Sequence, residues 1–214
     1  MWRVRRLPEV KRAFSVIWNT DELTTSLDVC NTVCVQGLVA LTDCTSATGG
    51  LCVIPGSHSS HEAICKQSKV ANALKTDFVP IEEDNDVLKL PKNFVKCQAG
   101  DLCVWDSRLV HCNTPANLDE VASALATKKA APTPPRATPP ELLRMVAYCC
   151  MTPRSFASRE TLRMRQLAYE TGLSTSHWPH CNIRVPHLDF DGTPGLRIND
   201  APESEIMRNL IGYD

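Results

Sequence analysis

Short apolar runs, each closed by a turn rich in glycine or proline, are the feature of this sequence that most limits its fold. VCVQGLVALTD (33–43) is a near-continuous apolar run rich in β-branched residues, which predicts a buried strand. TSATGG (45–50) follows it with two glycines that can take the positive φ angles of a turn. LCVIP (51–55) is then predicted to be the next strand, ended by its proline.

The same pattern continues in the second half of the chain. Residues 94–97 and 102–105 are predicted strands joined by a hairpin-like turn, QAGD, and MVAYCCM (145–151) predicts a further strand. Helices are predicted outside these strands, over residues 8–18, where apolar residues recur at helical spacing, and over residues 155–172.

Two segments depart from this alternation of strand and turn. SSHE (59–62) is typical of a capping box, with Ser59 as N-cap and Glu62 at the third helical position, and predicts a short helix to about residue 71. Residues 120–140 hold five prolines among alanine, threonine and lysine. We expect a mobile insertion there, whose deletion changes stability little because long surface loops add only slowly to closure entropy.

Short strands flanked by helices predict a mainly β protein, a sandwich or barrel with helices outside it. At 214 residues the chain is long enough for one domain with its own core. We therefore expect a single domain over residues 1–214, with its core at about 8–155 and a C-terminal helix and tail at 155–214.

Charge and hydropathy exclude several classes of partner. The net charge is −1, which gives no case for binding nucleic acid or an anionic membrane, and no apolar run approaches the length of a membrane span. The basic residues near the start are not followed by the apolar segment of a signal peptide. An intracellular, cytoplasmic protein is therefore expected.

The sequence contains 11 cysteines and no C-x-x-C pair. Without a signal segment, we expect these cysteines to be reduced and mostly buried. A zinc module built from His177, His180, Cys181 and His187 is an alternative. It is the least favoured, because structural zinc sites usually need four well-spaced ligands.

Two stretches each run from a glycine through an apolar segment to a histidine: GLCVIPGSH, ending at His58, and GDLCVWDSRLVH, ending at His111. A histidine at the end of a barrel strand is either a polar residue of the rim or a metal ligand. Arg144 opens the strand predicted after His111, and arginine binds a carboxylate through two parallel hydrogen bonds. This pair suits an anionic co-substrate that chelates a metal ion.

Residues 35–58, 100–117 and 144–154 together resemble the phytanoyl-CoA dioxygenase family, and the flanks at 18–28 and 167–180 resemble one branch of it. These proteins are Fe(II)- and 2-oxoglutarate-dependent oxygenases. The resemblance implies a double-stranded β-helix (jelly-roll) core, iron and 2-oxoglutarate as cofactors, and a small-molecule substrate whose identity the sequence does not reveal.

The resemblance assigns roles to three residues. His111 matches the distal metal-binding histidine of the family, and Arg144 matches the arginine that binds the distal carboxylate of 2-oxoglutarate. His58 matches the histidine of the family's P-G-S-H stretch, which is structural rather than a ligand.

The chain departs from the family where the first two metal ligands belong. The family carries them as H-x-D shortly before the strand that corresponds to residues 35–41, and no histidine of this chain precedes His58. Asp28 is either the carboxylate ligand or part of the family's upstream S-x-D stretch, and we prefer the second interpretation. A facial triad needs two histidines and one carboxylate, so we expect an incomplete metal site and an incomplete jelly roll.

Two functions remain open on this evidence. One is an oxygenase that hydroxylates a C–H bond, with release of succinate and carbon dioxide, and is impaired by the missing ligands. The other is a non-catalytic jelly roll, either a pseudoenzyme or a truncated gene product. They differ in the number of ligand side chains that converge near His111.

Overall fold

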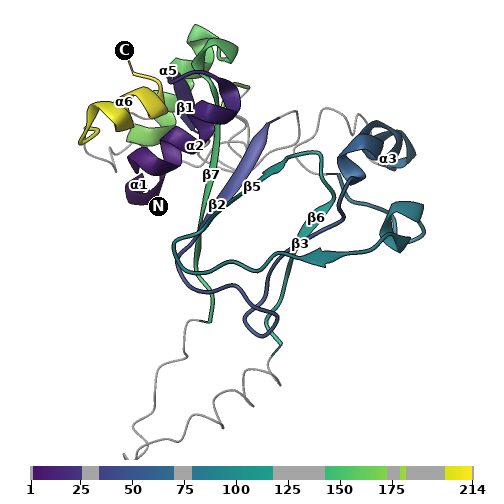
Figure 1. Ribbon diagram of the computed structural model, residues 1–214. Helices are drawn as coiled ribbons and strands as arrows, with labels where there is room; N and C mark the ends of the chain where they lie inside the picture. The colour runs from purple at the N-terminus through teal and green to yellow at the C-terminus, as the bar shows by residue number, and fades with distance from the viewer. Residues whose placement is uncertain are drawn as a thin grey trace, which may run out of the picture.

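The computed structural model describes residues 2–25, 34–69, 79–117, 143–172, 179–181 and 201–213. Within them the chain forms two antiparallel sheets and several helices (Figure 1). The larger sheet has the strand order β1-β7-β2-β5, formed by Leu23–Thr25, Val146–Pro153, Val35–Ala40 and Leu102–Asp106. The smaller has the order β4-β3-β6, formed by Asn93–Phe94, Gly50–Val53 and His111–Thr114.

Helices from both ends of the chain gather beside β1 and β7 (Figure 1). They are α1 (Trp2–Arg5), α2 (Pro8–Trp18), α5 (Arg159–Glu170) and α6 (Glu205–Ile211). The helix α3 (His61–Gln67) lies apart from them, and short 3-10 turns complete the pattern: η1 (Ser57–Ser60), η3 (Asp86–Lys89) and η4 (Arg154–Phe156). No helix among the described residues is long and apolar enough to cross a membrane.

The strand β2 is buried on both faces. Val39 packs in a core with Phe14 of α2 and Leu210 of α6, while Leu38 packs in a second core with Leu51 of β3. Alternate residues of a strand point to opposite faces, so one face of the larger sheet meets the helices and the other meets the smaller sheet. This double burial explains why residues 33–43 are almost continuously apolar.

Several predicted elements are confirmed. The strands β2, β3 and β7 and the helix α2 lie where the apolar patterns place them. The helix predicted over 155–172 begins later, at Arg159, because Ser158 caps it by accepting a hydrogen bond from the Thr161 amide at 3.1 Å. It ends as predicted, before Gly172, whose φ is 69°.

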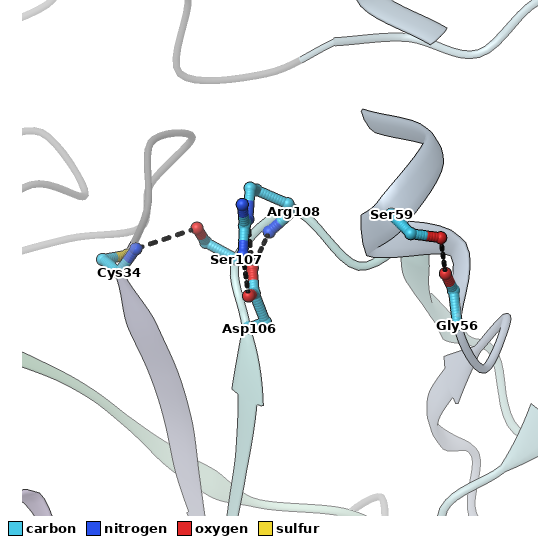
Figure 2. Close-up of polar contacts among 6 residues, drawn as sticks. All are labelled: Cys34, Gly56, Ser59, Asp106, Ser107 and Arg108. Carbon is cyan, nitrogen blue, oxygen red and sulfur yellow. Dashed lines mark hydrogen bonds and ion pairs between the residues drawn. The ribbon is translucent and has the colours of Figure 1, made fainter. Parts of the chain in front are cut away.

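The capping box predicted at residues 59–62 is wrong. The Ser59 hydroxyl donates to the Gly56 carbonyl at 2.7 Å (Figure 2). Glu62 pairs instead with Lys66, at 2.6 Å. The helix begins one residue later than expected, after Ser60, and no side chain caps it. It also ends at Gln67 rather than near residue 71.

The hairpin predicted for residues 94–97 and 102–105 is also wrong. The turn itself forms, because the Gln98 amide donates to Asp101 Oδ2 at 2.7 Å and Gly100 takes a φ of 99°. However, β4 pairs with β3 and β5 pairs with β2, so the turn connects the two sheets instead of two paired strands.

The described part of the chain is mixed rather than mainly β, because helices at both termini add to the predicted ones. The helix α6 is not predicted by the sequence analysis. Its signals are Ser204, whose side chain accepts from the Met207 amide, and Gly212, which has a φ of 118°. The predicted insertion at 120–140 lies outside the described residues.

Candidate functional site

The two sheets approach each other where β5 ends and β6 begins. The centroid of the Trp105 ring, near the end of β5, lies 5.5 Å from the centroid of the His111 ring at the start of β6. Val35, the first residue of β2, is opposite Asp106 in the larger sheet, and Val53, the last residue of β3, is opposite His111 in the smaller sheet. The candidate site therefore lies at strand ends contributed by both sheets.

His111 is held in a defined orientation. Its Nδ1 atom lies 2.6 Å from the Leu109 carbonyl oxygen. A carbonyl oxygen only accepts hydrogen bonds, so Nδ1 carries a proton, and in the neutral ring the Nε2 lone pair is then the one available to a metal ion. Metal-binding histidines are commonly oriented in this way, by a backbone carbonyl on the nitrogen that does not bind the metal.

Arg144 contacts the same strand as His111. Its Nη2 donates to Asn113 Oδ1 at 3.0 Å, and Asn113 Nδ2 donates to the Tyr148 hydroxyl at 3.0 Å. Asn113 follows His111 by two residues on β6, so both side chains point to the same face of that strand. Asn113 thus joins Arg144 to the face of β6 that carries His111.

Two buried N–H donors beside this face have no hydrogen-bond partner among the described residues. They are Arg144 Nε and Trp105 Nε1. Only 8% of Trp105 is exposed. Because buried polar atoms are nearly always hydrogen-bonded, these two donors favour a bound acceptor such as a carboxylate.

The described residues do not assemble a metal triad around His111. Among the residues that the structure describes, no group of three His, Cys, Asp or Glu side chains is arranged to hold a metal ion. Asp28 lies outside the described residues. His111 therefore fits the role of one ligand, and the other two positions of the family's triad are not filled by this part of the chain.

The sequence contains one His-x-Asp triplet, His187-Leu188-Asp189, whose histidine is named above only for the zinc alternative and not as an iron ligand. It follows the last predicted helix, whereas the family carries its motif before the strand that corresponds to β2. The H-x-D motif is therefore missing from the family's usual position, before β2, but not from the whole sequence. The triplet lies outside the described residues.

Asp106 and Arg108 are two site-proximal residues that the sequence analysis did not single out. Arg108 Nη2 lies 2.6 Å from Asp106 Oδ2, and Arg108 Nε lies 3.0 Å from Oδ1 (Figure 2). This ion pair holds the pKa of Asp106 below its usual range. Asp106, the carboxylate nearest to His111 in the sequence, is thus already paired with an arginine. The sequence signal of this pair is the D-x-R spacing at the end of β5.

His58 is exposed and follows β3 at the same strand ends. It lies close enough to Asp106 to add, after Arg108, to the lowering of the pKa of that carboxyl. We retain the structural role of His58 as a proposal.

The zinc alternative gains no support from the described part of its ligand set. His180 Nδ1 lies 3.1 Å from Thr152 Oγ1, while His177 and His187 lie outside the described residues. Burial lowers the pKa of His180, so its ring is mainly neutral at neutral pH.

Comparison with known proteins agrees with the resemblance seen in the sequence. Residues 16–118 match the family model described as phytanoyl-CoA dioxygenase (PhyH). The chain is also 26% identical over 215 residues to Ava biosynthesis cluster protein O of Aspergillus versicolor, a match that covers 84% of this chain and 63% of that protein. The chain thus spans less than two thirds of the length of this curated relative. These matches support a phytanoyl-CoA dioxygenase-like protein, and the family match lies in residues 16–118, which include β2, β3, β5 and His111.

Proposed function

We propose that this chain is a phytanoyl-CoA dioxygenase-like protein that binds 2-oxoglutarate through Arg144 but holds iron weakly, because its metal triad is incomplete. We also propose that its two facing antiparallel sheets correspond to the family's jelly-roll core. The family is generally dependent on Fe(II) and 2-oxoglutarate. In such proteins the bound iron supplies the oxygen activation.

The arrangement of Arg144 is the observation that carries this proposal. One guanidinium nitrogen is anchored to Asn113, and the buried Nε has no partner among the described residues. Asn113 shares its strand face with His111, so a dicarboxylate could meet Arg144 at one end and a metal ion on His111 at the other. Trp105 Nε1 offers a further donor to the same ligand.

The residues of the site have binding and orienting roles. The Leu109 carbonyl keeps the His111 Nε2 lone pair available for a metal ion, and Asn113 holds the Arg144 guanidinium in place. Because the described residues supply one of the three family ligands, we derive no hydroxylation step for this chain. A non-catalytic protein that binds 2-oxoglutarate is consistent with this arrangement.

A competent oxygenase is the alternative, and a specific sequence observation favours it. His187 and Asp189 have the spacing of the family's ligand pair, and Asp28 is a second carboxylate candidate. If these side chains complete the triad, His187→Ala should abolish metal binding as fully as His111→Ala does. If they do not, His187→Ala should leave metal binding unchanged.

We expect Arg144→Met to weaken 2-oxoglutarate binding by about 10- to 100-fold, because a charge-assisted hydrogen-bonded contact contributes about 1.5–3 kcal/mol. Isothermal titration calorimetry with 2-oxoglutarate and Mn(II), without oxygen, measures the affinity. Arg163→Met on the exposed side of α5 is the matched control and should bind as the unmodified chain does. Equal affinity in the unmodified chain and Arg144→Met, or no binding in either, would contradict the proposed role.

A further inference from the structure

Two cysteines on neighbouring strands are placed for a covalent bond. Cys52 of β3 lies directly opposite Cys112 of β6 in the antiparallel register. Opposite residues in such a pair have Cα atoms about 4.5–5.5 Å apart and side chains on the same face. Disulfides need Cα separations of about 4.4–6.8 Å, so the backbone of this pair already satisfies that requirement.

The two thiols are close to each other and reachable from solvent. The Cys52 and Cys112 side chains are neighbours in the register of β3 and β6. Consistent with this, burial and then the interaction with Cys52 raise the pKa of Cys112. Cys112 is exposed and Cys52 is half-buried. Both line a pocket of about 220 Å³, which gives a small oxidant access to the sulfur atoms.

A second cysteine pair shows why access matters. The sulfur atoms of Cys34 and Cys150 lie 3.6 Å apart, but these residues are only 1% and 4% exposed. A dissolved oxidant reaches such a pair only when the core opens. Of these two pairs, Cys52 and Cys112 are the one that solvent reaches in the folded chain.

We propose that Cys52 and Cys112 form a reversible disulfide when the protein meets a peroxide, and that this bond cross-links β3 to the strand that carries His111. The small fraction of Cys112 that is thiolate attacks a peroxide oxygen, the O–O bond breaks, and a sulfenic acid and hydroxide form. The Cys52 thiol then attacks the sulfenic sulfur, the S–S bond forms, the S–O bond breaks and water leaves. With hydrogen peroxide, two thiols and one peroxide give one disulfide and two waters.

The cross-link adds a constraint beside the candidate site. Cys52 directly precedes Val53, and Cys112 directly follows His111, which is opposite Val53 in the sheet. The bond would therefore fix the register of β3 and β6 at His111. It would also close a long loop in the unfolded chain, which stabilises the folded state. The proposed disulfide does not depend on 2-oxoglutarate binding, because it requires only the register of β3 and β6 and the access of an oxidant to the two thiols.

The test is peroxide treatment of the folded, full chain, followed by alkylation of the remaining thiols and peptide mapping by mass spectrometry. We expect a linked peptide pair that contains Cys52 and Cys112, loss of two hydrogen atoms from the intact mass, a higher melting temperature, and reversal by dithiothreitol. Cys52→Ser and Cys112→Ser should each abolish the link. Cys34→Ser, the control in the buried pair, should leave it unchanged.

Two outcomes would overturn the inference. One is a first disulfide between other cysteines, such as Cys97 and Cys103 or Cys34 and Cys150. The other is oxidation of Cys112 to sulfinic or sulfonic acid without any link to Cys52. Binding of phenylarsine oxide, a reagent for closely spaced dithiols, is an independent measurement, and the inference requires that it be lost in both the Cys52→Ser and Cys112→Ser variants.

Discussion

Arg165→Ala should lower the free energy of unfolding by about 3–5 kcal/mol, the largest effect that we expect from a single substitution. Arg165 is 0% exposed and lies on α5. It donates hydrogen bonds to four backbone carbonyls: Ile211 at 2.9 Å, Pro179 at 3.1 Å, Thr25 at 2.5 Å and Leu210 at 2.8 Å. Removing it leaves four buried acceptors unsatisfied and a cavity among α5, α6 and β1.

The charge of Arg165 is retained despite its burial. Burial, and then the positive charges of Arg5 and Arg154, lower its pKa to about 9, so it is still protonated at neutral pH. The four carbonyl acceptors favour that charged form. A neutral replacement therefore loses the four hydrogen bonds and also the attraction between the positive charge and the carbonyl oxygens.

Urea denaturation of the variant and the unmodified chain measures this loss. Arg163→Ala, an exposed arginine on the same helix, is the control and should change stability by less than about 0.5 kcal/mol. Arg165→Lys should lie between the two, because one ammonium cannot reach four carbonyls in three separate segments of the chain. A loss below about 1 kcal/mol for Arg165→Ala would contradict the role given to these bonds.

Gly49→Ala is the second substitution with a large expected effect. Gly49 has a φ of 78°, and a Cβ atom there would lie 2.8 Å from the Pro115 backbone carbon and in contact with the Thr114 carbonyl oxygen. The left-handed backbone costs a non-glycine residue about 1–2 kcal/mol, and displacing the chain just after β6 adds to it. We expect a total loss of about 3 kcal/mol or more.

Gly56→Ala is the matched control for this prediction. Gly56 has nearly the same φ, 79°, but no atom lies within 4 Å of the position of its Cβ. Its substitution should therefore cost only the backbone term, about 1–2 kcal/mol. Denaturant unfolding of both variants compares them directly, and equal losses would show that the contact with β6 is unimportant.

The sequence predicts those elements whose signal is local. The helical spacing of α2 gives its bounds, and the apolar runs give β2, β3 and β7. The glycine turn at 45–50 is also predicted for the right reason, since Gly49 has a positive φ. In each of these cases, residues that are close together in the sequence are enough to specify the buried face or the turn.

The errors in the fold arise where a local pattern has two outcomes. The residues of QAGD specify a turn, but turn chemistry does not specify that the strands on either side pair with each other. Glu62 has the spacing of a capping box with Ser59, yet it also has Lys66 four residues later and pairs with that residue. The seven-residue α6 is too short for a periodic signal, and packing on β1 and α5 stabilises it.

The candidate site is predicted only in part, because its residues come from distant segments. His111 and Arg144 follow from a family resemblance, and the structure adds that Asn113 lies on the face of β6 beside His111 and hydrogen-bonds Arg144. The D-x-R spacing of Asp106 and Arg108 is present in the sequence, but that spacing alone does not specify that the two side chains form an ion pair. Completion of the metal triad depends on side chains outside the described residues.

Anaerobic calorimetric titration with Mn(II) in the presence of 2-oxoglutarate, paired with an Fe(II)-dependent assay of succinate formation, tests the incomplete triad most directly. We expect weak metal binding, further weakened by His111→Ala, and little or no succinate, because a metal ion with too few protein ligands dissociates readily. Tight, stoichiometric metal binding that His111→Ala abolishes, together with succinate formation by the unmodified chain, would contradict this expectation.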